Sequence, residues 1–121
     1  MPIQRLLVAN RGEIALRVFR TCRALRIETV AVAAPDDSAA LHARSADATV
    51  EISNYLHSEE HIRAARETGA DSIHPGYGFL AENADFAETV EAAGLVFVGP
   101  TPDSLRRGGD KLEAKQIAVE A

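Results

Sequence analysis

Cysteine, methionine and aromatic side chains are scarce in this 121-residue sequence, which has one cysteine, one methionine, no tryptophan and only 5% aromatic residues. The single cysteine, Cys22, excludes a disulfide within the chain and fits a reducing compartment. Because aromatic residues are few, we expect a core built mainly from Ala, Val, Ile and Leu. Such a core is common in α/β domains.

Positive charge and long apolar runs are also scarce. The 13 basic and 18 acidic residues give a net charge of −5, whereas a nucleic-acid interface requires a basic surface. No run approaches the roughly 18 apolar residues of a membrane span, and the amino terminus becomes polar too early for a signal peptide. These absences predict a cytoplasmic protein that binds neither nucleic acid nor membrane.

Short apolar runs alternate with segments of helical periodicity along the chain. Strands are predicted at residues 5–9, 29–33, 48–52, 71–74 and 95–98, and helices at 13–25, 59–68, 85–93, 102–106 and 110–121. Near-continuous apolar strands separated by helices are typical of a parallel sheet with both faces covered. The sequence therefore predicts an α/β fold of about one domain, an open parallel sheet with helices on both faces.

The segment HPGYGFLAEN, residues 74–83, directly follows the fourth predicted strand. Pro75 fixes its φ angle, while Gly76 and Gly78 permit conformations and close approaches that other residues do not. A tyrosine between two glycines, Tyr77, has few side-chain neighbours and can face a ligand. The segment is interpreted either as a shaped ligand-binding loop at the end of a strand or as an ordinary Gly/Pro turn.

Other local patterns have structural interpretations. Asn10 and Glu13, three residues apart at the start of the first predicted helix, match a capping box. A dinucleotide fingerprint needs several glycines in this turn, and only Gly12 is present. The letters of His57–His61 match a zinc-protease pattern, but Ser58 is the expected N-cap of the next helix, which leaves His57 outside it. A nicotinamide-binding domain and a zinc site are therefore not expected.

Histidine and asparagine in the HPGYGFLAEN segment also allow two interpretations. His74, at the end of a strand, is either a structural hydrogen-bonding group or a catalyst. Asn83 either caps the following helix or belongs to the site. Four arginines of the first helical region, Arg17, Arg20, Arg23 and Arg26, form either a solvated face or a docking surface.

Four segments occur in a fixed order, ANRGEIALRVFRTCRAL (9–25), HPGYGFLAEN (74–83), VGPTPDSL (98–105) and GDKLEAKQ (109–116). Together they resemble the amino-terminal domain of biotin carboxylase, as found in acetyl-CoA, propionyl-CoA and pyruvate carboxylases. The resemblance covers essentially the whole chain. It implies a Rossmann-like pre-ATP-grasp domain over residues 1–109, with residues 110–121 as the start of the ATP-grasp region.

The resemblance implies that the parent protein is an enzyme, an ATP-dependent carbon–nitrogen ligase. In that family Mg-ATP phosphorylates bicarbonate to carboxyphosphate, and the resulting CO₂ is added to biotin on a carrier domain. ATP, Mg²⁺, bicarbonate and biotin are thus the implied ligands. The implied partners are the biotinylated carrier domain, the downstream ATP-grasp domain, a carboxyltransferase that selects the final carboxyl acceptor, and a second copy of the chain.

Site residues are carried over from the resemblance by position. Tyr77 would line the biotin pocket, with Gly76 and Gly78 shaping the approach and Glu82 continuing the active-site wall. Lys111, in the GDK segment, would contact ATP. The catalytic and metal-binding residues of the family lie beyond Ala121, so none is expected in this chain, and the chain alone is expected to be inactive.

The sequence departs from the family pattern at three places. Arg26 stands where the family usually has Gly after the first helix, so a left-handed residue there would be strained and the helix is expected to end differently. Gly108 stands where Met commonly precedes GDK, and the loop before Ser58 is several residues shorter than in many relatives. Two alternatives remain open: a stand-alone binding module, or the amino-terminal domain of another ATP-grasp ligase such as carbamoyl phosphate synthetase.

Overall fold

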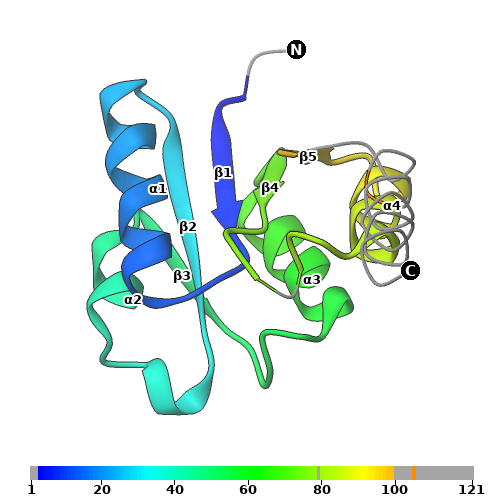
Figure 1. Ribbon diagram of the computed structural model, residues 1–121. Helices are drawn as coiled ribbons and strands as arrows, with labels where there is room; N and C mark the ends of the chain where they lie inside the picture. The colour runs from blue at the N-terminus through cyan, green and yellow to red at the C-terminus, as the bar shows by residue number, and fades with distance from the viewer. Residues whose placement is uncertain (1–2, 79, 100–104, 106–121) are drawn as a thin grey trace, which may run out of the picture.

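A five-stranded parallel sheet forms the centre of the computed structural model, which describes residues 3–78, 80–99 and 105 (Figure 1). All four neighbouring strand pairs are parallel. The order across the sheet is β3 (Ala48–Glu51), β2 (Glu28–Ala33), β1 (Arg5–Val8), β4 (Ser72–His74) and β5 (Val96–Phe97). The predicted α/β class and the five predicted strands are confirmed, with each strand end within one residue of its expected position.

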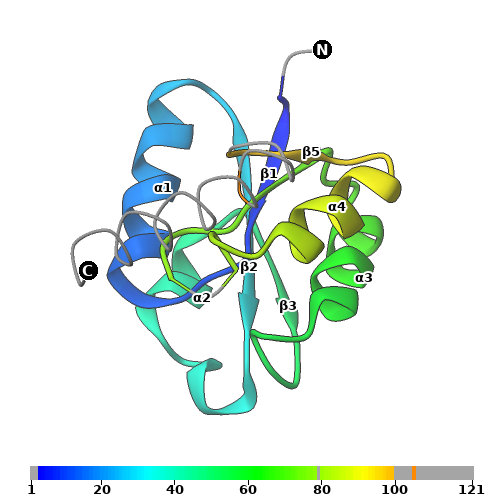
Figure 2. The ribbon, with the colours of Figure 1, turned by 45° about the vertical axis from the view of Figure 1, so that its right-hand side comes forward.

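Helices cover both faces of the sheet, as Figure 2 shows. On one face lie α1 (Gly12–Ala24) and α2 (Leu41–Ser45), and on the other lie α3 (Ser58–Thr68) and α4 (Ala84–Ala92). The sequence did not predict α2 or the 3-10 turn η1 (Pro35–Asp37), because neither is long enough to show a helical period. The helices expected at 102–106 and 110–121 lie outside the described residues, except for Leu105. Within the described part of the chain, none of the helices has the length and apolar character to cross a bilayer.

Two apolar clusters, one on each face of the sheet, hold the layers together. Alternate residues of a strand point to opposite faces, so Leu6 and Val8 of β1 pack towards α1, while Leu7 packs towards α3 and α4. The α1 side is completed by Ala15, Phe19, Cys22 and Ala31. The larger cluster on the other side includes Val30, Val32, Ile52, Ile62, Ile73, Phe86, Val90 and Phe97. Strands buried on both faces explain the continuous apolar runs of the sequence.

The N-terminal caps of the helices show that two of the local predictions are wrong and that a third is confirmed. The N-cap of α1 is Arg11, without a side-chain cap, so the capping box of Asn10 and Glu13 is not formed. Ser58 is the first residue of α3 and not its N-cap, a position that His57 takes. Asn83 caps α4 as one interpretation expected, because its Oδ1 accepts a hydrogen bond of 3.1 Å from the amide of Phe86.

The end of α1 differs from the expectation in its backbone. Arg26 has a φ of +60°, in the left-handed region, although the cost to a non-glycine residue predicted another ending. The Ile27 amide donates to the Cys22 carbonyl at 2.8 Å and the Arg26 amide donates to the Arg23 carbonyl at 3.1 Å. These two bonds form a Schellman motif, which satisfies the last carbonyls of the helix and compensates for the strain at Arg26.

Candidate functional site

The candidate site lies where the chain reverses its direction of travel across the sheet. From β1 the chain adds β2 and β3 on one side and then crosses back to add β4 and β5 on the other. In sheets of this order, ligands bind beside the carboxyl ends of the two strands at the reversal, here β1 and β4. Asn10 lies beyond the end of β1, and the glycine loop, residues 75–78, follows β4.

The Asn10 side chain holds the glycine loop in place. Its Nδ2 donates to the carbonyl of Pro75 at 3.1 Å and to the carbonyl of Tyr77 at 2.8 Å. Gly76 has a φ of +71°, and a Cβ added there would lie 2.5 Å from the Asn10 Nδ2. Glycine is therefore required at position 76 both for the turn and for the close approach of Asn10. Asn10 acts here as a bridge between two loops, a role that the sequence did not predict.

His74 stabilises the same turn from the strand side. Its Nδ1 accepts a hydrogen bond of 2.9 Å from the amide of Gly76, and burial of the ring lowers the pKa of His74. A neutral ring with a free lone pair on Nδ1 is the form that can accept this bond. The contact supports the structural one of the two interpretations of His74.

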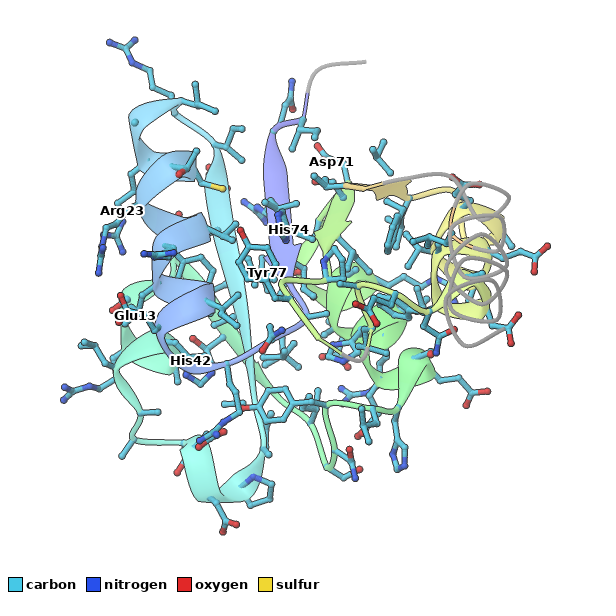
Figure 3. All side chains as sticks on the ribbon, in the orientation of Figure 1. Glu13, Arg23, His42, Asp71, His74 and Tyr77 are labelled. Carbon is cyan, nitrogen blue, oxygen red and sulfur yellow. The ribbon has the colours of Figure 1, made fainter. Side chains whose placement is uncertain are left out.

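Tyr77, at the tip of the glycine loop, is 69% exposed (Figure 3). It lines two hollows. A small cavity of about 120 Å³ is shared with Asn10, Tyr55, Leu56 and other residues at the ends of β1 and β4. An open apolar groove of about 360 Å³ runs along α1, where Ile14, Val18 and Leu25 line it together with His74. An exposed aromatic residue that lines a cavity is suited to binding a small planar ligand.

A polar cluster of Arg11, Asp37 and Tyr55 lies beside the small cavity. Arg11 Nε and Nη2 donate to the two carboxylate oxygens of Asp37, each at 2.7 Å. The Tyr55 hydroxyl donates to Asp37 Oδ2 at 2.6 Å and accepts from the amide of Ala34 at 3.2 Å. These residues come after β1, β2 and β3, so the cluster connects three loops at one edge of the sheet.

The cluster shifts the ionisation of its members. The hydrogen bonds from Arg11 and Tyr55 lower the pKa of Asp37 from 3.8 to about 2, although burial opposes the shift. Burial and the bond to Asp37 raise the pKa of Tyr55 to about 12, and Asp37 raises the pKa of Arg11. Asp37 is therefore an anion, and Tyr55 a neutral donor, throughout the physiological range. Such groups hold geometry and are not suited to proton transfer.

The two histidines of the zinc-like pattern have separate environments. His61 is fully buried, its Nε2 lies 2.7 Å from the carbonyl of Tyr55, and its ring packs edge-on against Phe86. His57 is exposed, with its Nδ1 3.3 Å from the carboxylate of Glu60. No group of three or more His, Cys, Asp or Glu residues that could hold a metal ion occurs among residues 3–78 and 80–99.

The sequence-predicted site residues are only partly brought together. Gly76, Tyr77 and Gly78 form one loop against Asn10, as described above. Glu82 is exposed in the turn before α4 and lines neither of the hollows that Tyr77 lines. Lys111 lies outside the described residues, so its proposed contact with ATP stays a prediction.

Sequence reasoning missed Asn10 as a loop bridge and the pair Asp37 and Tyr55 altogether. All three follow strand ends, and that position was the available signal, because the carboxyl ends of parallel strands meet at one edge of a sheet. Their partners are 18 to 67 residues away along the chain, which a local pattern does not reveal.

This strand order, with a bridged glycine loop at the reversal, defines a Rossmann-like α/β domain. Residues 2–105 match the family model described as "Biotin carboxylase, N-terminal domain", and the chain belongs to that family. It is 51% identical over 125 residues to the biotin carboxylase of Pseudomonas aeruginosa and 48% identical over 127 residues to the mitochondrial pyruvate carboxylase of Rattus norvegicus. These matches cover 98% and 99% of the chain but only 28% and 11% of the relatives.

A solved structure shows the same fold in a larger protein. The biotin carboxylase domain of a thermophilic 2-oxoglutarate carboxylase, bound to bicarbonate, superimposes with a TM-score of 0.89 at 43% identity. The match covers 97% of this chain and 28% of that one. The chain therefore spans less than a third of each of these relatives.

Proposed function

We propose that this domain forms one wall of the site at which a biotin carboxylase transfers a carboxyl group to biotin. In this proposal Tyr77 contacts biotin, while Gly76 and Gly78 let the backbone approach it. The observation that carries the proposal is the exposed Tyr77 ring, presented at the sheet reversal by a loop that Asn10 holds. Family membership supports the choice of biotin as the ligand.

The chemistry requires that carboxyphosphate meets biotin and not water. A ring that covers the bound ligand serves this purpose, and Tyr77 has both the exposure and a fixed loop. Its hydroxyl can donate and accept hydrogen bonds, which suits the polar ureido end of biotin. Glu82 is a weaker candidate for the same wall because it lies outside both hollows lined by Tyr77.

Mg-ATP and bicarbonate are the other proposed ligands of the whole protein. The residues described here contain no group that could hold Mg²⁺, so we propose that its ligands come from the ATP-grasp region. Lys111 is the proposed ATP contact of this chain, as a point charge for a phosphate. Bicarbonate is bound by the related 2-oxoglutarate carboxylase domain, which supports the same co-substrate here.

The proposed partners are a biotinylated carrier domain, the downstream ATP-grasp region, a carboxyltransferase and a second copy of the chain. We propose the domain division at residues 109 and 110. The final carboxyl acceptor is not assigned, because the relatives are named for pyruvate and for 2-oxoglutarate. The cytoplasm stays a prediction, since one relative is bacterial and another mitochondrial.

The test is the variant Tyr77→Ala in the full-length protein that carries this domain, assayed for carboxylation of free biotin. Loss of an aromatic contact of about 1.5 kcal/mol corresponds to a rise of roughly tenfold in the KM for biotin. The KM for Mg-ATP should not change, because Tyr77 is assigned to biotin alone.

Leu41→Ala is the matched control, since Leu41 is an exposed apolar residue on α2, away from the glycine loop. It should leave both Michaelis constants at the wild-type value. A Tyr77→Ala enzyme with an unchanged KM for biotin would contradict the proposed function.

A further inference from the structure

A row of hydrogen bonds crosses the carboxyl edge of the sheet in the order of the strands. Tyr55, after β3, donates to Asp37, after β2, and Asp37 accepts both bonds of Arg11, after β1. The Arg11 amide donates to Asn10 Oδ1 at 2.8 Å, and Asn10 Nδ2 donates to the glycine loop after β4. The loops of four adjacent strands are thus joined in one row. The row passes through the Arg11 side chain to its main-chain amide and ends at the Tyr77 carbonyl.

The row includes Asn10, which holds the glycine loop together with His74. The Asn10 Oδ1 accepts a bond from the main-chain amide of Arg11, while the Asn10 Nδ2 makes the two loop contacts. Arg11 is 60% exposed, and among the described residues Asp37 is the hydrogen-bonding partner of its guanidinium group. The two parallel bonds to this buried carboxylate constrain the guanidinium group.

The Tyr55 hydroxyl donates to the Asp37 carboxylate, and Tyr55 also lines the small cavity that Tyr77 lines. Its ring borders the cavity of about 120 Å³ that Asn10, Tyr77 and Gly78 line. We infer that Tyr55 is a positioning residue, which orients Tyr77 for biotin through Asp37, Arg11 and Asn10. This inference rests on the proposed function, because the orientation matters only if Tyr77 contacts the ligand.

The Tyr55 backbone is held independently of its hydroxyl. The Tyr55 carbonyl accepts a bond from buried His61. The two residues that precede Tyr55, Ser53 and Asn54, donate their main-chain amides to the Glu60 carboxylate. Removing only the hydroxyl should therefore leave the loop after β3 folded, while Asp37 loses one donor and the Ala34 amide loses its acceptor. Tyr55→Phe therefore tests the row of hydrogen bonds while the loop after β3 keeps its fold.

The experiment measures the KM for free biotin and for Mg-ATP in the full-length Tyr55→Phe enzyme. Loss of one hydrogen bond to a positioning carboxylate should raise the KM for biotin roughly fivefold and leave the KM for Mg-ATP unchanged. The matched control is Thr49→Val, which removes a hydroxyl that bonds the Ala43 carbonyl from within β3, outside the row. It should not change the KM for biotin.

Arg11→Lys is a second variant that keeps the charge but loses the two parallel bonds, and it should raise the KM for biotin in the same way. Coupling separates positioning from general stability. Combining Tyr55→Phe with Asn10→Ala should raise the KM for biotin no further than Asn10→Ala alone, because the row acts through Asn10. Additive effects of the two substitutions would overturn the inference.

The outcomes also separate this inference from the proposed function. If Tyr77→Ala raises the KM for biotin while Tyr55→Phe and Thr49→Val both leave it unchanged, the positioning role is wrong and the proposed function stands. If Tyr77→Ala has no effect, the proposed function fails and the inference fails with it.

Discussion

Gly76 and Gly78 lie two residues apart and differ in what a side chain would meet. Both have positive φ angles, +71° and +100°. A Cβ at Gly76 would approach three atoms of Asn10 within 2.9 Å, whereas a Cβ at Gly78 would meet no atom of the described residues within 4 Å. Position 76 is therefore constrained by packing and conformation, and position 78 by conformation alone.

Replacement of each glycine by alanine should show this difference. Gly78→Ala should cost about 1 to 2 kcal/mol of the free energy of unfolding, from backbone strain only. Gly76→Ala should cost a further 1 to 3 kcal/mol, roughly, because Asn10 has to move. Urea unfolding of both variants measures the difference. Equal losses would show that Asn10 yields without cost.

Arg26 is a strained residue whose surroundings suit glycine. Its φ of +60° closes the Schellman motif at the end of α1, and its side chain is exposed. Arg26→Gly should raise the free energy of unfolding by about 1 kcal/mol, because glycine adopts this conformation without a Cβ clash. Arg26→Ala is the control, since it keeps the Cβ and should bring no such gain. A similar gain from both variants would assign the effect to the arginine charge instead.

At the scale of elements, Asp37 joins the loops after β1, β2 and β3, and its ionisation makes the free energy of unfolding depend on pH at low pH. Its pKa falls from 3.8 to about 2 on folding, so the ionised group stabilises the protein above pH 4. This contribution is lost as the pH falls from about 4 to 2, because the folded protein then takes up the proton as well. A depression of this size corresponds to about 2 kcal/mol.

Asp37→Asn should therefore destabilise the protein by about 2 kcal/mol at pH 6, and the difference from wild type should shrink towards pH 2. Chemical unfolding at several pH values measures this. Asp36→Asn, at the exposed neighbouring position, should change the free energy by less than about 0.5 kcal/mol at each pH. A constant difference between Asp37→Asn and wild type across the pH range would contradict the assignment.

The elements differ in how far the sequence could predict them. All five strands and the helices α1, α3 and α4 were predicted to within one residue at each end, because burial imposes a clear period on each. The short α2 has five residues, too few to show a period, and was missed. Gly76, Tyr77 and Gly78 were proposed as site residues from residue type and family motif, and their role stays a prediction. Asn10, Asp37 and Tyr55 were missed because their roles depend on contacts between distant loops.

At the scale of the whole molecule, the chain corresponds to a minor part of larger relatives, between 11% and 28% of the two sequences compared. In the proposed function the described residues supply one wall of the biotin site, and they contain no group of three or more His, Cys, Asp or Glu that could hold a metal ion. We therefore propose that the activity belongs to a larger protein that contains this domain.

The 121-residue chain alone is expected to have no carboxylase activity and to give no measurable heat on titration with Mg-ATP. The reason is that charge on a transferring phosphoryl group has to be neutralised by a metal and basic residues, which we assign to the ATP-grasp region. Isothermal calorimetry tests this, with the full-length protein as the positive control. Tight binding of Mg-ATP by the isolated chain would show that the nucleotide site is more complete than proposed.

The row of bonds from Tyr55 to Tyr77 also limits how this domain can be recombined with its relatives. Asn10 bonds main-chain carbonyls of the glycine loop, so an imported loop should keep these contacts wherever it keeps the same backbone turn. The contacts among Arg11, Asp37 and Tyr55 join side chains, so the loops after β1, β2 and β3 are best exchanged as a single set. Surface positions on α3 and α4 outside the row can be varied one at a time.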